Sequence, residues 1–186
     1  MSDPAPQAMS VEEYLRFEEK SAQKHEYVGG FVYPLHAHAG ASEAHVLICM
    51  NVAANLYPDA LRTGCRLYQS DMKLRVEDTT SFFYPDVMLV CDPGDTDRLA
   101  KTSPCLLVEV LSPSTASHDR LGKYGIYTAI PSLQTYLIVS QAERYVVEYQ
   151  RTGGGWQMRE HRGEGEVGVP CLGRTLTLDD IYRAVL

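Results

Sequence analysis

The chain has 186 residues and a formal net charge of −7, with 45% hydrophobic and 22% charged residues. This length and composition suggest one globular domain with a sizeable core. No apolar run approaches the roughly 20 residues that cross a bilayer, and the N-terminus lacks the basic and apolar regions of a secretory signal. We expect a cytoplasmic protein without membrane contact, with residues 1–9 as a flexible tail and 10–186 as a single domain.

The cysteines give a second indication of compartment. Five of them occur, and no pair is closer than fourteen residues, at Cys49, Cys65, Cys91, Cys105 and Cys171. The odd count and the wide spacing argue against a disulfide framework and against the paired cysteines of structural zinc sites. We therefore expect free thiols in a reducing cytoplasm.

The first third of the chain predicts helix, hairpin, helix. Apolar residues at helical spacing and an N-cap at Ser10 predict a helix over Met9–Lys20. The segment "KHEYVGGFVYPL" reads as two strands joined at a Gly-Gly turn, with Glu26 on the first strand. A second helix is expected to begin after Ser42 and to end before Pro58.

The rest of the chain is rich in strands. "CRLYQSDMKLRV" predicts a strand or a bent pair, and "FFYPDVMLVCDP" predicts one strand with Pro85 near its start. "PCLLVEVLS" and "LQTYLIVS" are almost wholly apolar, which is typical of central strands, and the helix between them makes them parallel. A hairpin with a glycine-rich turn and a short helix from Thr177 follow. We predict an α/β (α+β) fold, a mixed β-sheet flanked by helices.

Two acids interrupt the apolar strands, Asp86 in "YPDVMLV" and Glu109 in "LLVEVL". An unpaired buried carboxylate is costly, so each needs a cation. If the strands are neighbours, both acids reach one point, and two carboxylates with a backbone carbonyl and waters suit Mg²⁺. The alternatives are that the acids pair with Arg or Lys, or that they lie in solvent at strand ends.

The arrangement resembles the PD-(D/E)xK nuclease pattern, in which an Asp and a Glu on adjacent strands bind the metal. In that pattern a Lys two residues after the Glu handles the attacking water, but Leu111 stands at this position. The simplest form of the motif is therefore broken, and alone it matches many unrelated sequences.

A wider resemblance covers nearly the whole chain. "EEYLRFEEKSAQKHEYVGG", "GASEAH", "CRLYQSDMKLRV", "YPDVMLVCDP", "LLVEVLSPSTASHDRLGKYGIY", "IPSLQTYLIV" and "LTLDDIY" are similar to segments of the Uma2 (DUF820) family of restriction-endonuclease-like proteins. The resemblance implies a restriction-endonuclease-like fold with a metal site on the central strands, bounded by an N-terminal helix-hairpin and a C-terminal hairpin.

In this family the lysine is displaced to the helix after the strand, and Lys123 is the position that matches. Asp119 and Lys123 are four residues apart and share a helix face, so an ordinary surface ion pair is the alternative. Lys73 points the same way as Asp71 if their segment is a strand, and it is a second candidate for the same role.

Further candidates come from the resemblance. Glu26 matches an acidic family position and is a possible additional metal ligand, although a solvated hairpin acid is equally consistent with the sequence. His45 matches a family histidine that could contact phosphate or a metal-bound water, and a purely structural histidine is the alternative. The carbonyl of Val110 is a candidate backbone ligand.

These observations predict an Mg²⁺- or Mn²⁺-dependent endonuclease that hydrolyses DNA, with Asp86 and Glu109 binding the metal and Lys123 positioning water. Cleavage of both strands needs two sites, so we expect a homodimer. The net charge and the departures from the family pattern favour an alternative, a nuclease-fold module that binds nucleic acid or protein with little catalysis. A hydrolase acting on another phosphoester is a third hypothesis.

Overall fold

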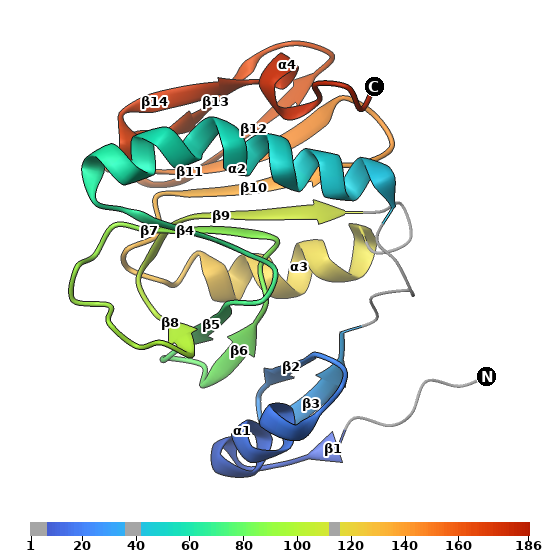
Figure 1. Ribbon diagram of the computed structural model, residues 1–186, viewed down its shortest axis with the longest axis vertical. Coiled ribbons are helices and arrows are strands. Elements are labelled where there is room, and N and C mark those ends of the chain that lie inside the picture. The colour runs from blue at the N-terminus through green and yellow to red at the C-terminus, as the bar shows by residue number, and fades with distance from the viewer. Residues whose placement is uncertain (1–6, 36–41, 112–115) are drawn as a thin grey trace.

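The computed structural model describes residues 7–35, 42–111 and 116–186, and it does not describe the side chains of residues 116–121. Its elements form two mixed sheets and a small third sheet of two strands, with helices on the outside (Figure 1). This arrangement confirms the predicted α+β fold class. No helix within the described ranges is long and apolar enough to cross a membrane.

The N-terminal sheet has the strand order β1-β3-β2-β6-β5-β8. Its strands are β1 (Gln7–Ala8), β2 (His25–Val28), β3 (Phe31–Pro34), β5 (Lys73–Val76), β6 (Ser81–Phe83) and β8 (Ala100–Lys101). Helix α1 (Val11–Lys20) packs on this sheet through an aromatic cluster that includes Tyr14, Tyr27 and Phe82. The predicted helix and hairpin are confirmed, including the Ser10 capping box. Gln7–Ala8, within the segment expected as a tail, pair with β3.

The central sheet has the order β12-β11-β10-β9-β7-β4. Its strands are β4 (Arg66–Gln69), β7 (Val87–Val90), β9 (Pro104–Leu111), β10 (Thr135–Ser140), β11 (Tyr145–Thr152) and β12 (Gly155–Arg162). Every residue of β9 is buried, and β9 pairs with β10 in parallel, as predicted. The pairing of β7 with β9 is antiparallel and shifts register between Leu89 and Val90.

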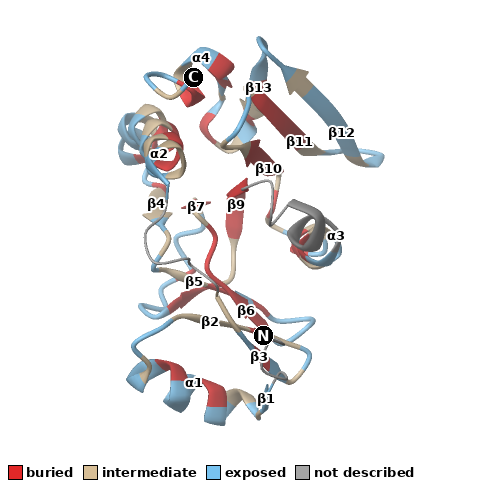
Figure 2. Cartoon of the chain, turned by 90° about the vertical axis from the view of Figure 1, so that its right-hand side faces the viewer, coloured by how far each residue is buried: buried red, intermediate tan, exposed pale blue. Residues whose placement is uncertain are grey.

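Two helices cover opposite faces of the central sheet (Figure 2). Helix α2 (Glu43–Thr63) packs on one face, and α3 (Ala116–Tyr127) packs on the other. The remaining elements lie beyond β12 in the sequence: β13 (Glu166–Val169), η1 (Pro170–Leu172), β14 (Arg174–Thr177) and α4 (Leu178–Ile181). They complete the core on the α2 face. The prediction that α2 ends before Pro58 is wrong, because the helix continues through this residue to a left-handed Gly64.

The chain crosses between the two sheets once within a segment predicted as a strand or a bent pair and once within a segment predicted as one strand. "CRLYQSDMKLRV" forms β4 in the central sheet and β5 in the N-terminal sheet, with Ser70 at a positive φ of 41° between them. "FFYPDVMLVCDP" was expected to be one strand but separates into β6 and β7 around Pro85, which has no N–H for a ladder. Asp86 therefore lies at the junction of the two sheets.

The prediction of five free thiols is wrong. Disulfides join Cys65 to Cys91 and Cys105 to Cys171, and Cys49 is the free thiol among the described residues. Sequence spacing did not reveal these pairs because sheet pairing creates them: Arg66 of β4 lies opposite Val90 of β7, which brings the flanking cysteines together.

Candidate active site

Glu109 lies in the second half of β9 and is 4% exposed. Successive side chains of a strand point to opposite faces. Val110 packs in the core below α2, whereas Leu107 and Leu111 pack in the core below α3. Glu109 therefore points toward α3, away from the α2 face.

Helix α3 supplies two polar side chains that meet Glu109 there. The Lys123 ammonium lies 3.2 Å from Glu109 Oε1, and the Tyr127 hydroxyl donates to the same oxygen at 2.8 Å. Lys123 is 7% exposed and also lies 2.8 Å from Glu26 Oε1 on β2. Residues four apart share a helix face, so one side of α3 presents both groups to the strand. The lysine thus joins acids from both sheets.

Asp86 stands beside this group at the start of β7. Because Val87 lies opposite Val108, the residue before β7 reaches the level of Glu109 on β9. Asp86 Oδ2 accepts a hydrogen bond of 2.7 Å from the Val110 amide, and Oδ1 lies 3.2 Å from His45 Nε2. These two contacts fix the carboxylate at the boundary between the sheets and the first turn of α2.

The electrostatic balance of the cluster is acidic. Burial raises the pKa of the Glu109 carboxyl, the Lys123 ammonium counteracts this, and the Asp86 and Glu26 carboxylates raise it again, to about 8. The hydrogen bond to Asp86 raises the pKa of His45. Three carboxyl groups thus share one lysine and a partly buried histidine, so Glu109 holds a proton near neutral pH. A divalent cation that binds here would take the place of this proton.

The donor atoms fit such a cation. Carboxylate oxygens from β2, β9 and the start of β7 are the ligands that Mg²⁺ and Mn²⁺ prefer. Ligand atoms of His45, Cys49 and Asp86 also lie within 4.8 Å of one another, so nitrogen and sulfur donors adjoin the acids. Donors of this kind suit transition metals better than Mg²⁺.

Two further sequence candidates are Lys73, whose described contact lies at Tyr84, and Asp119, whose side chain is not described. Lys73 lies on β5 with its ammonium 6.0 Å from the centre of the Tyr84 ring, and the Tyr84 hydroxyl donates to the buried Glu18 of α1. Asp119 belongs to the first turns of α3, where side chains are outside the described residues. The ion pair expected between Asp119 and Lys123 therefore stays a prediction.

The structure adds two residues that sequence reasoning missed. Tyr127 contacts Glu109, and the Cys49 sulfur lies 3.8 Å from His45 Nδ1. Both stand four residues after a candidate already chosen, Lys123 and His45 respectively. The helical spacing was therefore the signal that could have identified them.

Comparison with known proteins identifies the family. The family model Uma2, described as "Putative restriction endonuclease", matches residues 11–179. The chain belongs to the Uma2 family. Two relatives come from Synechocystis sp. (strain ATCC 27184 / PCC 6803 / Kazusa). "Uncharacterized protein slr1290" is 36% identical over 99% of this chain and 96% of its own length. "Uncharacterized protein sll1609" is 38% identical over 84% of this chain and 89% of its own length.

A solved structure shares the fold. It is the crystal structure of "a putative nuclease belonging to DUF820" from Anabaena variabilis, with a TM-score of 0.76, 13% identity, and coverage of 96% of this chain and 99% of that one. The Uma2 protein described here therefore has a nuclease-like fold, and the predicted family resemblance is confirmed.

Proposed function

We propose that this Uma2 protein is a metal-dependent endonuclease that hydrolyses DNA phosphodiester bonds. The observation that supports this most is the buried contact of Lys123 with Glu109 and Glu26, beside Asp86. A buried excess of carboxylates, with one lysine among them, combines a cation site with a group that can hold water or phosphate. The family description and the nuclease-like neighbour support the same assignment.

In this proposal Asp86, Glu109 and the Val110 carbonyl hold Mg²⁺ or Mn²⁺, with Glu26 as a further ligand. The bound ion supplies Lewis-acid chemistry, polarising the scissile phosphate and lowering the pKa of water. His45 holds Asp86 through the 3.2 Å contact, and Tyr127 holds Glu109 through its hydroxyl. Such partners orient ligating side chains before the ion arrives.

Lys123 positions the attacking water and stabilises charge on the phosphate. The oxygen of this water forms a bond to phosphorus while the bond from phosphorus to the 3′ oxygen breaks. The leaving oxygen takes up a proton, which gives a 3′-hydroxyl and a 5′-phosphate, the products implied by the family resemblance. No covalent enzyme intermediate is required, so the chain needs no nucleophile of its own.

Contact with the DNA backbone requires local positive charge despite the net charge of −7. Arg66 donates to the carbonyls of Asp92 and Asp95, and Lys101 is buried, so these two stabilise the fold. Lys73 and Arg75 lie on β5, in the same sheet as Glu26, and Arg75 is exposed. We assign phosphate contacts to this pair.

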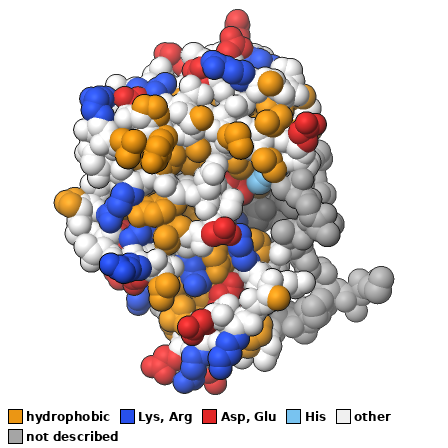
Figure 3. Space-filling view, in the orientation of Figure 1, with side chains coloured by type: hydrophobic (Ala, Val, Ile, Leu, Met, Phe, Trp, Pro, Cys, Tyr) orange, Lys and Arg blue, Asp and Glu red, His pale blue; other side chains and the backbone are white. Residues whose placement is uncertain are grey.

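A second copy of the chain would supply the second site for double-strand cleavage. Hydrophobic side chains gather on the surface along the band that α2 occupies (Figure 3). They include the exposed residues Val46, Met50, Tyr57 and Leu61. If these residues form the dimer interface, light scattering should give the mass of a dimer for the wild type and a lower mass for Met50→Lys. A wild type with the mass of a monomer would contradict the homodimer.

The decisive experiment is cleavage of supercoiled plasmid with Mg²⁺ or Mn²⁺. The wild type should convert supercoiled DNA to nicked and linear forms, and Glu109→Gln should not. Glu148→Gln is the matched control, because Glu148 is also a buried glutamate of the central sheet, bonded to Gly168 and His161 away from the site. Equal activity of wild type and Glu109→Gln would contradict the proposal.

One observation favours a second function, a binding module without catalysis. Lys123 already contacts both Glu26 and Glu109, so the fold supplies these two acids with a cation of its own. A wild type that binds DNA in a mobility-shift assay, yet cleaves none of its forms with either metal, would establish this alternative.

A further inference from the structure

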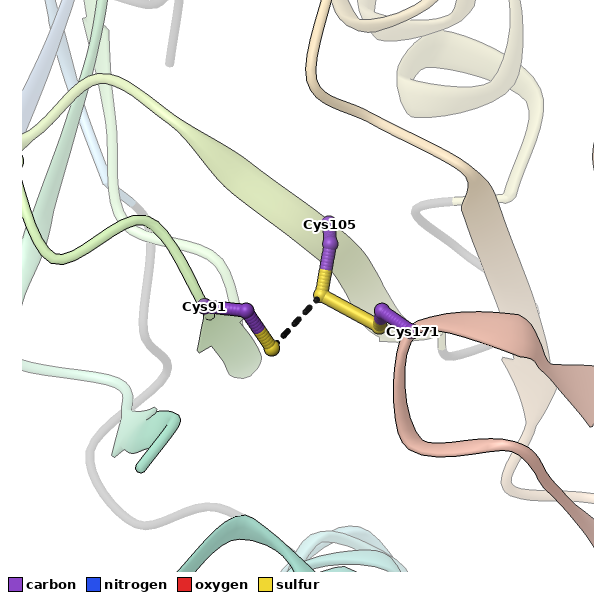
Figure 4. Close-up of side chains that lie close together, drawn as sticks. All are labelled: Cys91, Cys105 and Cys171. Carbon is purple, nitrogen blue, oxygen red and sulfur yellow. Dashed lines mark hydrogen bonds between the residues drawn. A yellow bond between two sulfur atoms is a disulfide. The ribbon is translucent and has the colours of Figure 1, made fainter. Parts of the chain in front are cut away.

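Four cysteines from separate segments converge at one end of the central sheet. Cys65 precedes β4, Cys91 follows β7, Cys105 lies in β9 and Cys171 lies in η1. The two disulfides, Cys65–Cys91 and Cys105–Cys171, are in contact: Cys91 Sγ lies 3.6 Å from Cys105 Sγ. Figure 4 shows the side chains of Cys91, Cys105 and Cys171 close together. Their sulfur atoms all lie within 4.8 Å of one another.

This convergence is more than two crosslinks require. A disulfide ties two segments, and two disulfides in one small domain need not touch. Here β7 lies between β4 and β9 in the sheet, and η1 packs over the same core, so the fold itself brings the sulfurs of Cys91, Cys105 and Cys171 within 4.8 Å of one another. The fourth sulfur, that of Cys65, is bonded to Cys91 beside this group. Three sulfurs at one place with a fourth next to them are a starting geometry for a shared ligand.

The surroundings suit thiolates. The Thr63 hydroxyl donates to Cys65 Sγ at 3.2 Å, which is a partner of the kind that holds and stabilises ligating sulfur. Cys65 and Cys105 are buried, whereas Cys91 and Cys171 are half-buried, so the cluster is packed on one side and reachable from the other.

We propose that the reduced protein binds one Zn²⁺ ion through the thiolates of Cys65, Cys91, Cys105 and Cys171. A dithiol or phosphine reductant gives each disulfide two electrons, and two protons complete each pair of thiols. The four thiols then lose four protons as the ion binds. A Zn–S bond of about 2.3 Å in a tetrahedron places sulfurs about 3.8 Å apart, close to the Cys91–Cys105 separation.

The site is independent of the acidic cluster and does not rest on the proposed nuclease function. Asp86 precedes β7 and Cys91 follows it, while Cys105 begins β9 and Glu109 lies toward its other end. The two sites therefore occupy opposite ends of the same two strands. Sulfur ligands select Zn²⁺ over Mg²⁺, so the ions of the two sites are also distinct.

The test is a titration of the folded, phosphine-reduced chain with Co²⁺ in the absence of oxygen. One equivalent should produce the ligand-field and sulfur-to-cobalt charge-transfer bands of a tetrahedral thiolate site, and Zn²⁺ should then remove them. Cys91→Ser and Cys171→Ser, at the two half-buried positions, should each abolish these bands. Cys49→Ser removes the buried free thiol beside His45 and Asp86, and the bands should survive this change. Loss of the bands in Cys49→Ser would assign them to that group and would overturn the proposal.

Circular dichroism is used to check that each variant is folded. Two separate serine variants are included so that the test still stands if one of them does not fold. The proposal is overturned if the reduced, folded wild type produces no such bands, or if they survive both Cys91→Ser and Cys171→Ser. It is equally overturned if thiol titration shows that the disulfides stay closed under reductant in the folded protein. The cysteines would then act as crosslinks alone.

Discussion

Lys123 and Glu109 are fourteen positions apart in the sequence, and their charged groups meet at 3.2 Å in the buried space between α3 and the central sheet. A lysine two residues after the acid would have pointed to the same face from the same strand. Its displacement to a helix lets it contact Glu26 of the N-terminal sheet as well. The two sheets are thereby joined by one ammonium group at the candidate site.

Replacing this lysine tests its role directly. Lys123→Met keeps the length of the side chain and removes the charge, and we expect plasmid cleavage to fall by about 10²-fold or more, as for loss of a general acid–base group. Lys101→Met is the matched control, because Lys101 is equally buried but donates to the carbonyls of Asp95 and Asp97. A Lys123→Met variant that is folded and fully active would transfer attention to Lys73.

Tyr127→Phe should change the pH dependence of cleavage. The hydroxyl that Tyr127 donates lowers the pKa of Glu109, so its removal raises this pKa further, and metal binding then requires a higher pH. We expect the pH profile of the cleavage rate to shift to higher pH. We also expect the free energy of unfolding to fall by about 2 kcal/mol. Tyr14→Phe, which removes a buried hydroxyl bonded to the His25 carbonyl, should leave the profile in place.

The stability of the metal-free protein should fall as the pH rises. The pKa of Glu109 is about 8 in the folded state against an ordinary value of 4.5, so the folded protein binds this proton more tightly than the unfolded chain does. The contribution of this proton to the free energy of unfolding is complete below about pH 4.5 and is lost as the pH rises through 8. The free energy of unfolding then changes by no more than about 1.4 kcal/mol per pH unit.

Chemical denaturation in EDTA at several pH values measures this effect. Glu109→Gln should remove the slope between pH 5 and pH 8, whereas Glu148→Gln should retain it. A wild type whose stability rises over this range would show that Glu109 is ionised by its contact with Lys123.

His45→Gln should weaken metal binding more than it slows the saturated reaction. His45 Nε2 lies 3.2 Å from Asp86 Oδ1, so the imidazole acts by holding a proposed ligand. Loss of such a partner costs about 10- to 100-fold in metal affinity. The measurement is the Mn²⁺ concentration for half-maximal cleavage. An unchanged concentration with a lower maximal rate would place His45 against the substrate instead.

The sequence predicted features that local chemistry controls. Ser10 has the residues of a capping box and caps α1, and the uninterrupted apolar run around Glu109 forms a strand buried on both faces. The parallel pairing of β9 with β10 followed from the helix between them. For the site, the prediction that Lys123 returns to Glu109 agrees with the geometry, although its catalytic role awaits the experiments above.

Features that depend on long-range pairing could not be predicted. Pro85 was expected within one strand, but the chain changes sheets there. The residues before it pair with β5 in the N-terminal sheet, and the residues after it pair with β9 in the central sheet. Pro58 was expected to end α2, yet the packing of Leu56 and Ala60 in the core sustains the helix beyond it. Likewise, no local pattern places Cys65 opposite Cys91, since the register of β4 on β7 decides it.

The register shift between Leu89 and Val90 separates the two ends of the β7–β9 pair. On the acidic side the alternation of faces is continuous from Val87 to Leu89, so Glu109 keeps its direction toward α3. Beyond the shift, the pairing of β7 with β9 no longer follows the register that sets Asp86 level with Glu109. We therefore expect a change in the length of the segment that connects the two strands to leave the acidic side unchanged.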